Sequence, residues 1–286
     1  MSWWANCHTH CRWCDGKGTP AEILSAALSQ SVRSLGFSSH APVPYPNEWC
    51  LNKENVSAYL NEVRSLAEQN RELSIYTGME VDFIPGVQGP GSIKDMHGLD
   101  YVIGAVHFIG TEKGCTLTVD GCARELNDCI GGFYEGSTEK MVRDYWNLIR
   151  RMVVESPPDI IAHLDLVKKN NAGNRFFSQD DKWYREEALE TLAVIAAGDC
   201  IVEINTGSMT RWNLSEFYPA PWMVRECLKR GIRLTLNSDS HTPEHVTGSF
   251  SKAAAILEEL GCRELMVLES GGWKACSFNK NGILGN

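Results

Sequence analysis

The sequence lacks long hydrophobic runs, an excess of positive charge and any low-complexity linker. Its longest apolar stretches, such as 189–197, fall well short of the roughly 20 residues that cross a bilayer, so we expect no membrane-spanning helix. Lys and Arg number 27 against 36 Asp and Glu, a net charge of −9. This balance argues against partners such as long nucleic acids or anionic membranes, which require a basic face.

The N-terminus also lacks the cationic start and apolar stretch of an export signal. We therefore expect a cytoplasmic protein. Its 11 cysteines are an odd number, which excludes complete pairing, and most should be reduced thiols. No Pro- or Ser-rich tract and no internal repeat divides the chain, which favours one domain over residues 1–286.

Short apolar runs alternate with longer stretches of helical periodicity about seven times. The expected strands are 3–7, 34–38, 74–83, 101–108, 160–164, 201–205, 233–237 and 264–268, and the expected helices are 20–34, 54–70, 139–154, 181–197, 220–229 and 249–259. This alternation is typical of parallel strands covered by helices, in an open sheet or a closed barrel. Thr19 and Glu22 form a capping box that begins the first helix. Gly198, Gly231 and Gly261 are expected left-handed helix ends.

Imidazole and carboxylate groups recur at or just after the ends of the expected strands. These groups are His8, His10, Asp15, His40, Glu80, His107, His163, Asp239 and His241. Because parallel strands end on one face, the nine side chains should converge there, which favours the barrel. Buried carboxylates so close together would repel one another without cations. Mixed ligation of this kind suits two or three ions of zinc, iron or manganese.

Spacing within two of the strand ends supports a metal site. His8 and His10 are two residues apart, as are Asp239 and His241, so each pair points to one face of an extended chain. One such pair is weak evidence. Two pairs together with the other strand-end ligands favour a metal site over a structural role.

Seven stretches resemble a known family over nearly the whole chain. They are residues 7–10 (CHTH), 36–42 (GFSSHAP), 78–86 (GMEVDFIPG), 100–108 (DYVIGAVHF), 162–169 (AHLDLVKK), 203–206 (EINT) and 237–241 (NSDSH). In this order they resemble the polymerase and histidinol phosphatase (PHP) superfamily, and most of all its monofunctional histidinol-phosphate phosphatases. The resemblance implies a distorted TIM-like barrel of seven β/α units in a single domain.

The resemblance also implies a trinuclear centre. By position, one ion would be held by His8, His10, Glu80 and Asp239, a second by Glu80, His107 and His163, and a third by Asp15, His40 and His241. Glu80, Asp239 and His241 are the catalytic candidates. The implied reaction is hydrolysis of L-histidinol phosphate to histidinol and phosphate in histidine biosynthesis. Many relatives carry Asp where this chain has Cys7 or Asn6, and Ser39, which bears on metal preference.

Clustered divalent ions lower the pKa of a bound water, so that hydroxide can attack phosphorus. Arg175 and Arg211 follow strands on the reactive side and are candidates for binding the phosphate of a small substrate. A metal-bound water or an acid group such as His241 would supply the proton for the leaving alkoxide. The segment 110–136 is long for a β/α connection and is expected to be a loop or lid over the site.

Other interpretations remain open at this stage. Cys7, Cys11 and Cys14 match the spacing of the iron–sulfur motif of radical S-adenosylmethionine enzymes, although His8 and His10 lie inside that motif. A metal-binding module without catalysis is a second alternative. A third keeps hydrolysis but changes the substrate to another small phosphate or a short phosphodiester.

Overall fold

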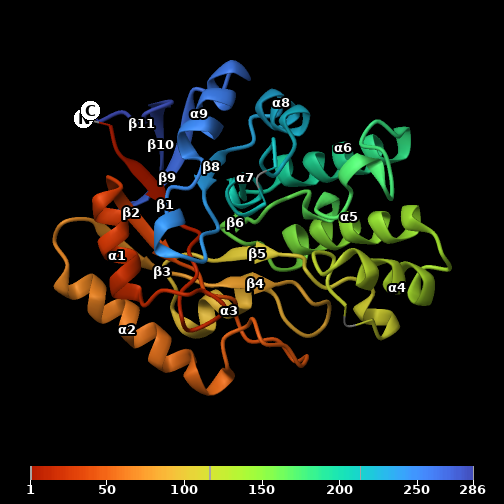
Figure 1. Cartoon of the computed structure of the whole chain (residues 1–286), viewed down its shortest axis with the longest axis horizontal. Coiled ribbons are helices and arrows are strands. Elements are labelled where there is room, and N and C mark those ends of the chain that lie inside the picture. Colours follow the sequence, from red (N-terminus) through yellow and green to blue (C-terminus); the bar gives the residue numbers. More distant parts are fainter. Residues whose placement is uncertain (1, 116, 213, 286) are drawn as a thin grey trace.

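The computed structural model describes residues 2–115, 117–212 and 214–285. Parallel strands occupy the centre of the molecule and helices surround them (Figure 1). The parallel strands are β1 (Trp4–Asn6), β2 (Val32–Phe37), β3 (Ser74–Thr77), β4 (Glu80–Asp82), β5 (Ile103–Ala105), β6 (Ile160–Ile161), β7 (Ile201–Asn205) and β8 (Leu234–Asn237). The helices are α1 (Pro20–Ser29), α2 (Val56–Gln69), α3 (Pro90–His97), α4 (Ala123–Phe133), α5 (Thr138–Glu155), α6 (Lys182–Ala197), α7 (Gly207–Arg211), α8 (Pro221–Lys229) and α9 (Phe250–Glu259). None of these described helices combines the length and hydrophobicity that crossing a membrane requires.

The parallel strands form two sheets that join at their carboxyl ends. The first sheet has the order β1-β2-β3 and the second the order β4-β5-β6-β7-β8. An isolated parallel pair between His40 and Glu80 links β2 to β4, and another between Thr9 and Ser240 links the ends of β1 and β8. The strands therefore follow one another around an irregular ring. This confirms the predicted α/β class, and the two links agree with the expected distorted TIM-like barrel.

The ring is irregular where one strand was expected over 74–83. That segment is broken into β3 and β4 at Gly78. The aromatic side chain of Tyr101 packs against this break. A Cβ at Gly78 would lie 2.5 Å from Tyr101 Cζ, and one at Gly36 would lie 2.3 Å from its hydroxyl. The Tyr101 hydroxyl donates to the Cys7 carbonyl at 2.6 Å. Two glycines thus admit one large side chain between the sheets.

The C-terminal segment forms an antiparallel sheet, of which the sequence predicts only the strand over 264–268. It comprises β9 (Glu264–Glu269), β10 (Gly272–Asn279) and β11 (Gly282–Ile283). Hydroxyls near the starts of β2 and β8 hold β9 in place. Ser34 Oγ donates to the Leu268 carbonyl at 2.8 Å and Thr235 Oγ1 to that of Met266 at 2.9 Å. The hairpin therefore lies near the amino ends of the strands, away from their carboxyl ends.

Helix boundaries follow the predicted chemistry with one exception. The Thr19–Glu22 capping box is present. Gly231 and Gly261 have φ values of 68° and 90°, as left-handed helix ends require. The prediction for Gly198 was wrong, because α6 ends with extended backbone at that residue, φ −99° and ψ −168°.

The segment 110–136 is not a simple loop. It contains a short 3-10 turn (Thr111–Lys113) and α4. Cys115 and Cys129 are buried, and their sulfurs lie 3.3 Å apart between the start of the segment and this helix. The expected long loop is therefore a partly helical insertion between β5 and α5. Whether it acts as a lid stays a prediction.

Candidate metal centre

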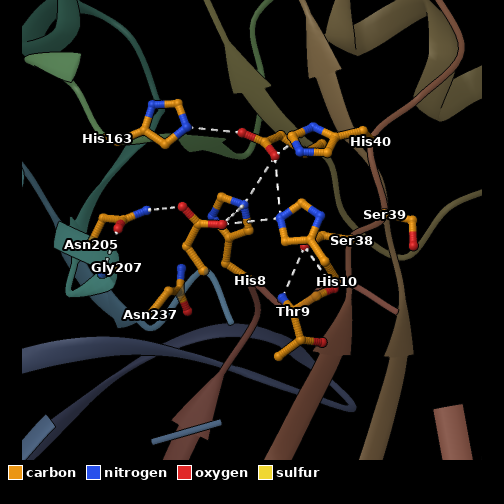
Figure 2. A network of polar contacts seen from close by, with 12 residues as sticks. His8, Thr9, His10, Ser38, Ser39, His40, His163, Asn205, Gly207 and Asn237 are labelled. Atoms are coloured by element: carbon orange, nitrogen blue, oxygen red, sulfur yellow. Dashed lines mark hydrogen bonds and ion pairs between the residues drawn. The ribbon is translucent and has the colours of Figure 1, made fainter. Parts of the chain in front are cut away.

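Eight of the nine side chains singled out above follow the carboxyl ends of parallel strands, and the ninth, Glu80, lies just after the break between β3 and β4. His8, His10 and Asp15 follow β1, His40 follows β2, Glu80 begins β4, His107 follows β5, His163 follows β6, and Asp239 and His241 follow β8. Seven are buried, whereas Asp15 and His241 are partly exposed. Figure 2 shows His8, His10, His40 and His163 pointing toward one another, with His8 and His10 on the same segment after β1 and the other two on other segments.

Glu80 lies at the centre of this cluster, with imidazoles on both of its carboxylate oxygens. Oε2 is 3.2 Å from His8 Nε2, 3.4 Å from His10 Nε2 and 3.0 Å from His40 Nδ1. Oε1 is 3.0 Å from His163 Nε2 and 3.8 Å from His107 Nε2. A carboxylate placed in this way can bridge two ions.

The remaining carboxylates complete the cluster on the side of β1 and β8. Asp239 Oδ1 lies 3.1 Å from His10 Nε2 and 3.6 Å from His8 Nε2. Asp15 Oδ2 lies 3.2 Å from His241 Nε2. Three compact groups emerge, each able to hold an ion. They are His10, Asp15, His40 and His241; His8, His10 and Asp239; and His40, Glu80 and His107.

These groups resemble the ligand sets implied by the sequence but do not reproduce them fully. In the structure His10 is close enough to belong to two groups, and His40 stands beside Glu80 and His107 as well as near Asp15. Of the three carboxylates in the cluster, the His163 ring contacts Glu80 only. The division of ligands among ions therefore stays a prediction.

Several buried polar atoms in the cluster have no hydrogen-bond partner in the described part of the chain. They are His8 Nε2, His10 Nε2, His40 Nδ1 and Glu80 Oε2. Leaving one such atom unpaired costs about 1–3 kcal/mol. Ligands about 2.0–2.2 Å from one tetrahedral ion lie roughly 3.3–3.6 Å apart, and the distances above, from 3.0 to 3.8 Å, lie on both sides of this range. The residues therefore fit divalent metal ions.

Two of the nine residues have strained backbones. His163 has a φ of 23° and Asp239 a φ of 51°, in a region that non-glycine residues seldom adopt. The structure holds both side chains toward the cluster at that cost. Strain of this kind gathers at functional sites.

Two further carboxylates orient the histidines by contacting the ring nitrogens that point away from the cluster. Glu203 is fully buried on β7, and its Oε1 lies 2.6 Å from His8 Nδ1. Its Oε2 accepts from the backbone N–H of His163 at 2.9 Å. Asp82 Oδ1 lies 3.0 Å from His107 Nδ1. Each carboxylate leaves the opposite ring nitrogen, Nε2, free to face the cluster.

The sequence pattern assigns no role to Glu203 or Asp82, although both lie inside the stretches that resemble the family. It points only to the residues next to the histidines, for their bearing on metal preference. Asn6 does not contact an imidazole ring; it bonds Ser238 Oγ and the Val246 carbonyl, each at 2.7 Å. The orienting carboxylates come from strands distant in the sequence. The lack of Asp before His8 therefore does not leave that histidine without a carboxylate.

Charges within the cluster shift the pKa values of its members in opposite directions. Burial would raise the pKa of Glu80, but His40 and His8 outweigh it and hold that pKa well below its usual range. Burial and the neighbouring His241 and His40 lower the pKa of His10 to about 3. Glu80 is thus an anion and His10 neutral near pH 7, the forms in which both residues bind metals.

A cavity of about 630 Å³ opens onto the cluster. Arg211 lines it and donates to Asp239 Oδ2 at 2.7 Å. Arg175 does not belong to this cavity, because a turn at Gly173 leaves it exposed against the ring of Phe176. The structure therefore brings one of the two predicted arginines to the site. Trp49 and Trp212 also line the cavity.

The three cysteines of the first loop do not form a metal site. Cys7 belongs to an inner apolar cluster with Tyr101, whereas Cys11 packs in the main core. Burial raises the pKa of Cys14 to about 12. No thiol belongs to any of the metal-binding groups found among the described residues. Alternation along the chain turns His8 and His10, not the thiols, toward Glu80 in the cluster. The iron–sulfur interpretation is therefore not supported.

A model of the PHP domain matches residues 6–207, which is most of the chain and includes seven of the nine side chains above. The chain is a member of the PHP family. A relative from Deinococcus radiodurans, named "Probable histidinol-phosphatase", is 33% identical over 262 residues, covering 90% of this chain and 93% of the relative. The histidinol-phosphatase of Bacillus subtilis is 26% identical over 251 residues, 82% and 92% of the two chains.

A solved structure shares the fold of this PHP chain. It is a histidinol phosphate phosphatase from Lactococcus lactis in complex with zinc, L-histidinol and phosphate. The two superpose with a TM-score of 0.65 at 21% identity, over 99% of each chain. The predicted PHP membership is confirmed.

Proposed function

We propose that this protein is a metal-dependent phosphomonoester hydrolase that converts L-histidinol phosphate and water to L-histidinol and phosphate. The observation that carries the proposal is the cluster of six imidazoles and three carboxylates around Glu80, at the floor of one cavity. The family match and the two histidinol-phosphatase relatives support the choice of substrate.

The proposed ligands are the nine residues of the cluster, and we propose two or three ions of zinc, iron or manganese. Glu80, Asp239 and His241 act in catalysis through the ions that they help to hold. Divalent ions bound there would lower the pKa of water and offset the negative charge of a phosphate ester. The zinc in the Lactococcus lactis complex supports zinc among these metals.

Other residues of the chain bind and orient the substrate and the ligands. The Arg211 guanidinium lies beside His241 Nδ1, at 3.0 Å, and on the cavity wall. Its planar fork suits the oxygens of a phosphate. Glu203 and Asp82 keep His8 and His107 in the tautomer whose Nε2 faces the cluster. We therefore propose a small phosphorylated molecule as the partner. We also infer a cytoplasmic setting, because all 11 cysteines of the chain are free thiols.

The test is phosphate release by the purified protein, with its metal content measured by elemental analysis. The panel contains L-histidinol phosphate, sugar phosphates, nucleoside monophosphates and a short phosphodiester. We expect the highest kcat/KM for L-histidinol phosphate. A fully metal-loaded protein that releases phosphate from none of them would overturn the proposal. A clear preference for another ester would keep the hydrolase and change its substrate.

A further inference from the structure

The cavity has one carboxylate that the metal cluster does not use. Four acidic residues line the cavity, and three of them, Asp15, Glu80 and Asp239, belong to the cluster. The fourth is Asp120, which comes from the insertion between β5 and α5. An anionic side chain is unexpected in the wall of a cavity that receives a phosphate. Lys169, which also lines the cavity, pairs with Asp120 Oδ2 at 3.2 Å, and a cationic group on the substrate would account for the other oxygen.

Backbone pairing places Asp120 close to the metal cluster. Phe108 pairs with Thr118 in an isolated bridge, and the Val119 N–H donates to the His107 carbonyl at 2.7 Å. Asp120 is the next residue along the chain. It therefore lies one residue beyond a contact with the backbone of a proposed metal ligand. A substrate held by its phosphate at the cluster would present the atoms next to its ester within reach of this wall.

Lys169 anchors Asp120 and leaves part of its carboxylate available. Lys169 Nζ donates to the Asp120 carbonyl at 2.8 Å and to Oδ2 at 3.2 Å. Asn170 Nδ2 donates to the adjacent Gly121 carbonyl at 2.7 Å. A carboxylate can accept about four hydrogen bonds, and the side chain of Asp120 is 29% exposed. Within the described residues Oδ1 has no hydrogen-bond partner, so it can accept from a ligand.

A second polar group of the same cavity also lacks a partner. Tyr218 is 4% exposed and lines the cavity. Its hydroxyl is buried without a hydrogen bond to any described residue. Two backbone hydrogen bonds with Asn205, of 2.7 and 3.0 Å, hold it beside the strand that carries Glu203. Asp120 is one of the groups whose charge raises the pKa of Tyr218, after burial and Asp165.

We propose that Asp120 selects substrates by binding a primary ammonium group close to the phosphate ester, with the Tyr218 hydroxyl as a second acceptor. The site would thus prefer phosphate monoesters of amino alcohols to those of sugars or simple alcohols. An ammonium offers three donors, and a carboxylate only accepts, so the two are complementary. This inference rests on the proposed phosphatase function and assigns the amino-alcohol part of the substrate to named residues.

The test compares two esters that differ only in the ammonium group. They are L-histidinol phosphate and 3-(imidazol-4-yl)propyl phosphate, which lacks the amine. For Asp120→Asn we expect kcat/KM for the amino ester to fall by about ten- to a hundredfold, the worth of a hydrogen bond to a charged group. The change should appear mainly in KM. The value for the deaminated ester should stay within about twofold.

Two variants make the comparison specific. Asp128→Asn is the matched control, because Asp128 lies on α4 in the same insertion with its side chain 65% exposed, and it should change neither ester. Tyr218→Phe should reduce the preference for the amino ester by a few-fold. Metal content and the melting temperature of each variant are measured alongside.

The outcomes separate this inference from the proposed function. Equal losses for both esters in Asp120→Asn, at unchanged metal content, would overturn the role of Asp120 in selection while the phosphatase stands. An unmodified, metal-loaded protein that hydrolyses neither ester would overturn the proposed function itself. A wild-type protein that does not prefer the amino ester would also overturn the inference.

Discussion

The floor and the wall of the cavity are built in different ways. On the floor, eight of the nine ligand side chains follow the carboxyl ends of β1, β2, β5, β6 and β8. The ninth, Glu80, begins β4 and contacts five imidazoles. On the wall, Asp120 and Trp212 come from irregular segments. Regular strands place groups within a few tenths of an ångström, as metal ligation requires. Connections between them can vary without disturbing that geometry.

This difference separates reactivity from selectivity. Changes on the floor should affect the hydrolysis of every phosphate ester, because the floor would contact the phosphate group that all of them share. Changes on the wall should affect some esters and spare others. The predictions below test where one region ends and the other begins.

The largest effect is expected for Glu80→Gln. Gln lacks the negative charge of the Glu80 carboxylate, which five imidazoles surround. It is therefore a weaker ligand for the two ions that Glu80 is proposed to bridge. We expect kcat/KM to fall by about a thousandfold or more for every ester, together with a loss of bound metal by elemental analysis. Glu186→Gln, on the exposed face of α6, is the matched control. Full activity in Glu80→Gln would refute the bridging role.

Arg211→Gln should have the next largest effect. The guanidinium donates to Asp239 and lines the cavity, so its loss removes a cation that would face the phosphate. We expect phosphate release to slow by about a hundredfold for all esters, with metal still bound. Arg175→Gln is the matched control, because Arg175 is exposed outside the cavity, and it should behave like the unmodified protein. A selective loss for one ester would instead give Arg211 a role in choosing the substrate.

The floor could be predicted from the sequence because its signals are local. Period-two spacing turns His8 and His10 to one face, and strand ends in a parallel barrel share one rim. The break between β3 and β4 could not be predicted, since Tyr101, from the segment before β5, packs there against Gly36 and Gly78.

The supporting and selective residues were missed for a similar reason. The contact of Glu203 with His8 joins residues 195 positions apart, and no spacing rule reveals it. Asp120 follows no expected strand, and only its pairing beside His107 brings it to the cavity. For Arg175 the expectation failed because the turn at Gly173 directs the chain outward. Long-range contacts decide each of these positions.

Glu203→Gln should weaken the floor without abolishing it. Gln can still accept from His8 Nδ1 but loses the charge that makes that imidazole a better ligand. We expect metal affinity to fall by about ten- to a hundredfold, measured by titration of the metal-free protein. Activity should return when excess metal is added. Under the same conditions Glu80→Gln should stay inactive. If excess metal does not restore the activity of Glu203→Gln, Glu203 does more than position His8.

The smallest effect is expected for Cys14→Ser, at the edge of the floor. Cys14 Sγ lies 3.5 Å from His10 Nδ1, and a serine hydroxyl can replace this weak contact, so kcat/KM should stay within about twofold. Metal content should not change, because the thiol belongs to none of the metal-binding groups among the described residues. Cys122→Ser, at an exposed position, is the control.

Purification without oxygen tests the alternative of sulfur ligation. If the protein is brown, and its colour and iron disappear in Cys14→Ser, a thiol binds metal at the floor. That result would overturn the assignment of the metal site to histidines and carboxylates.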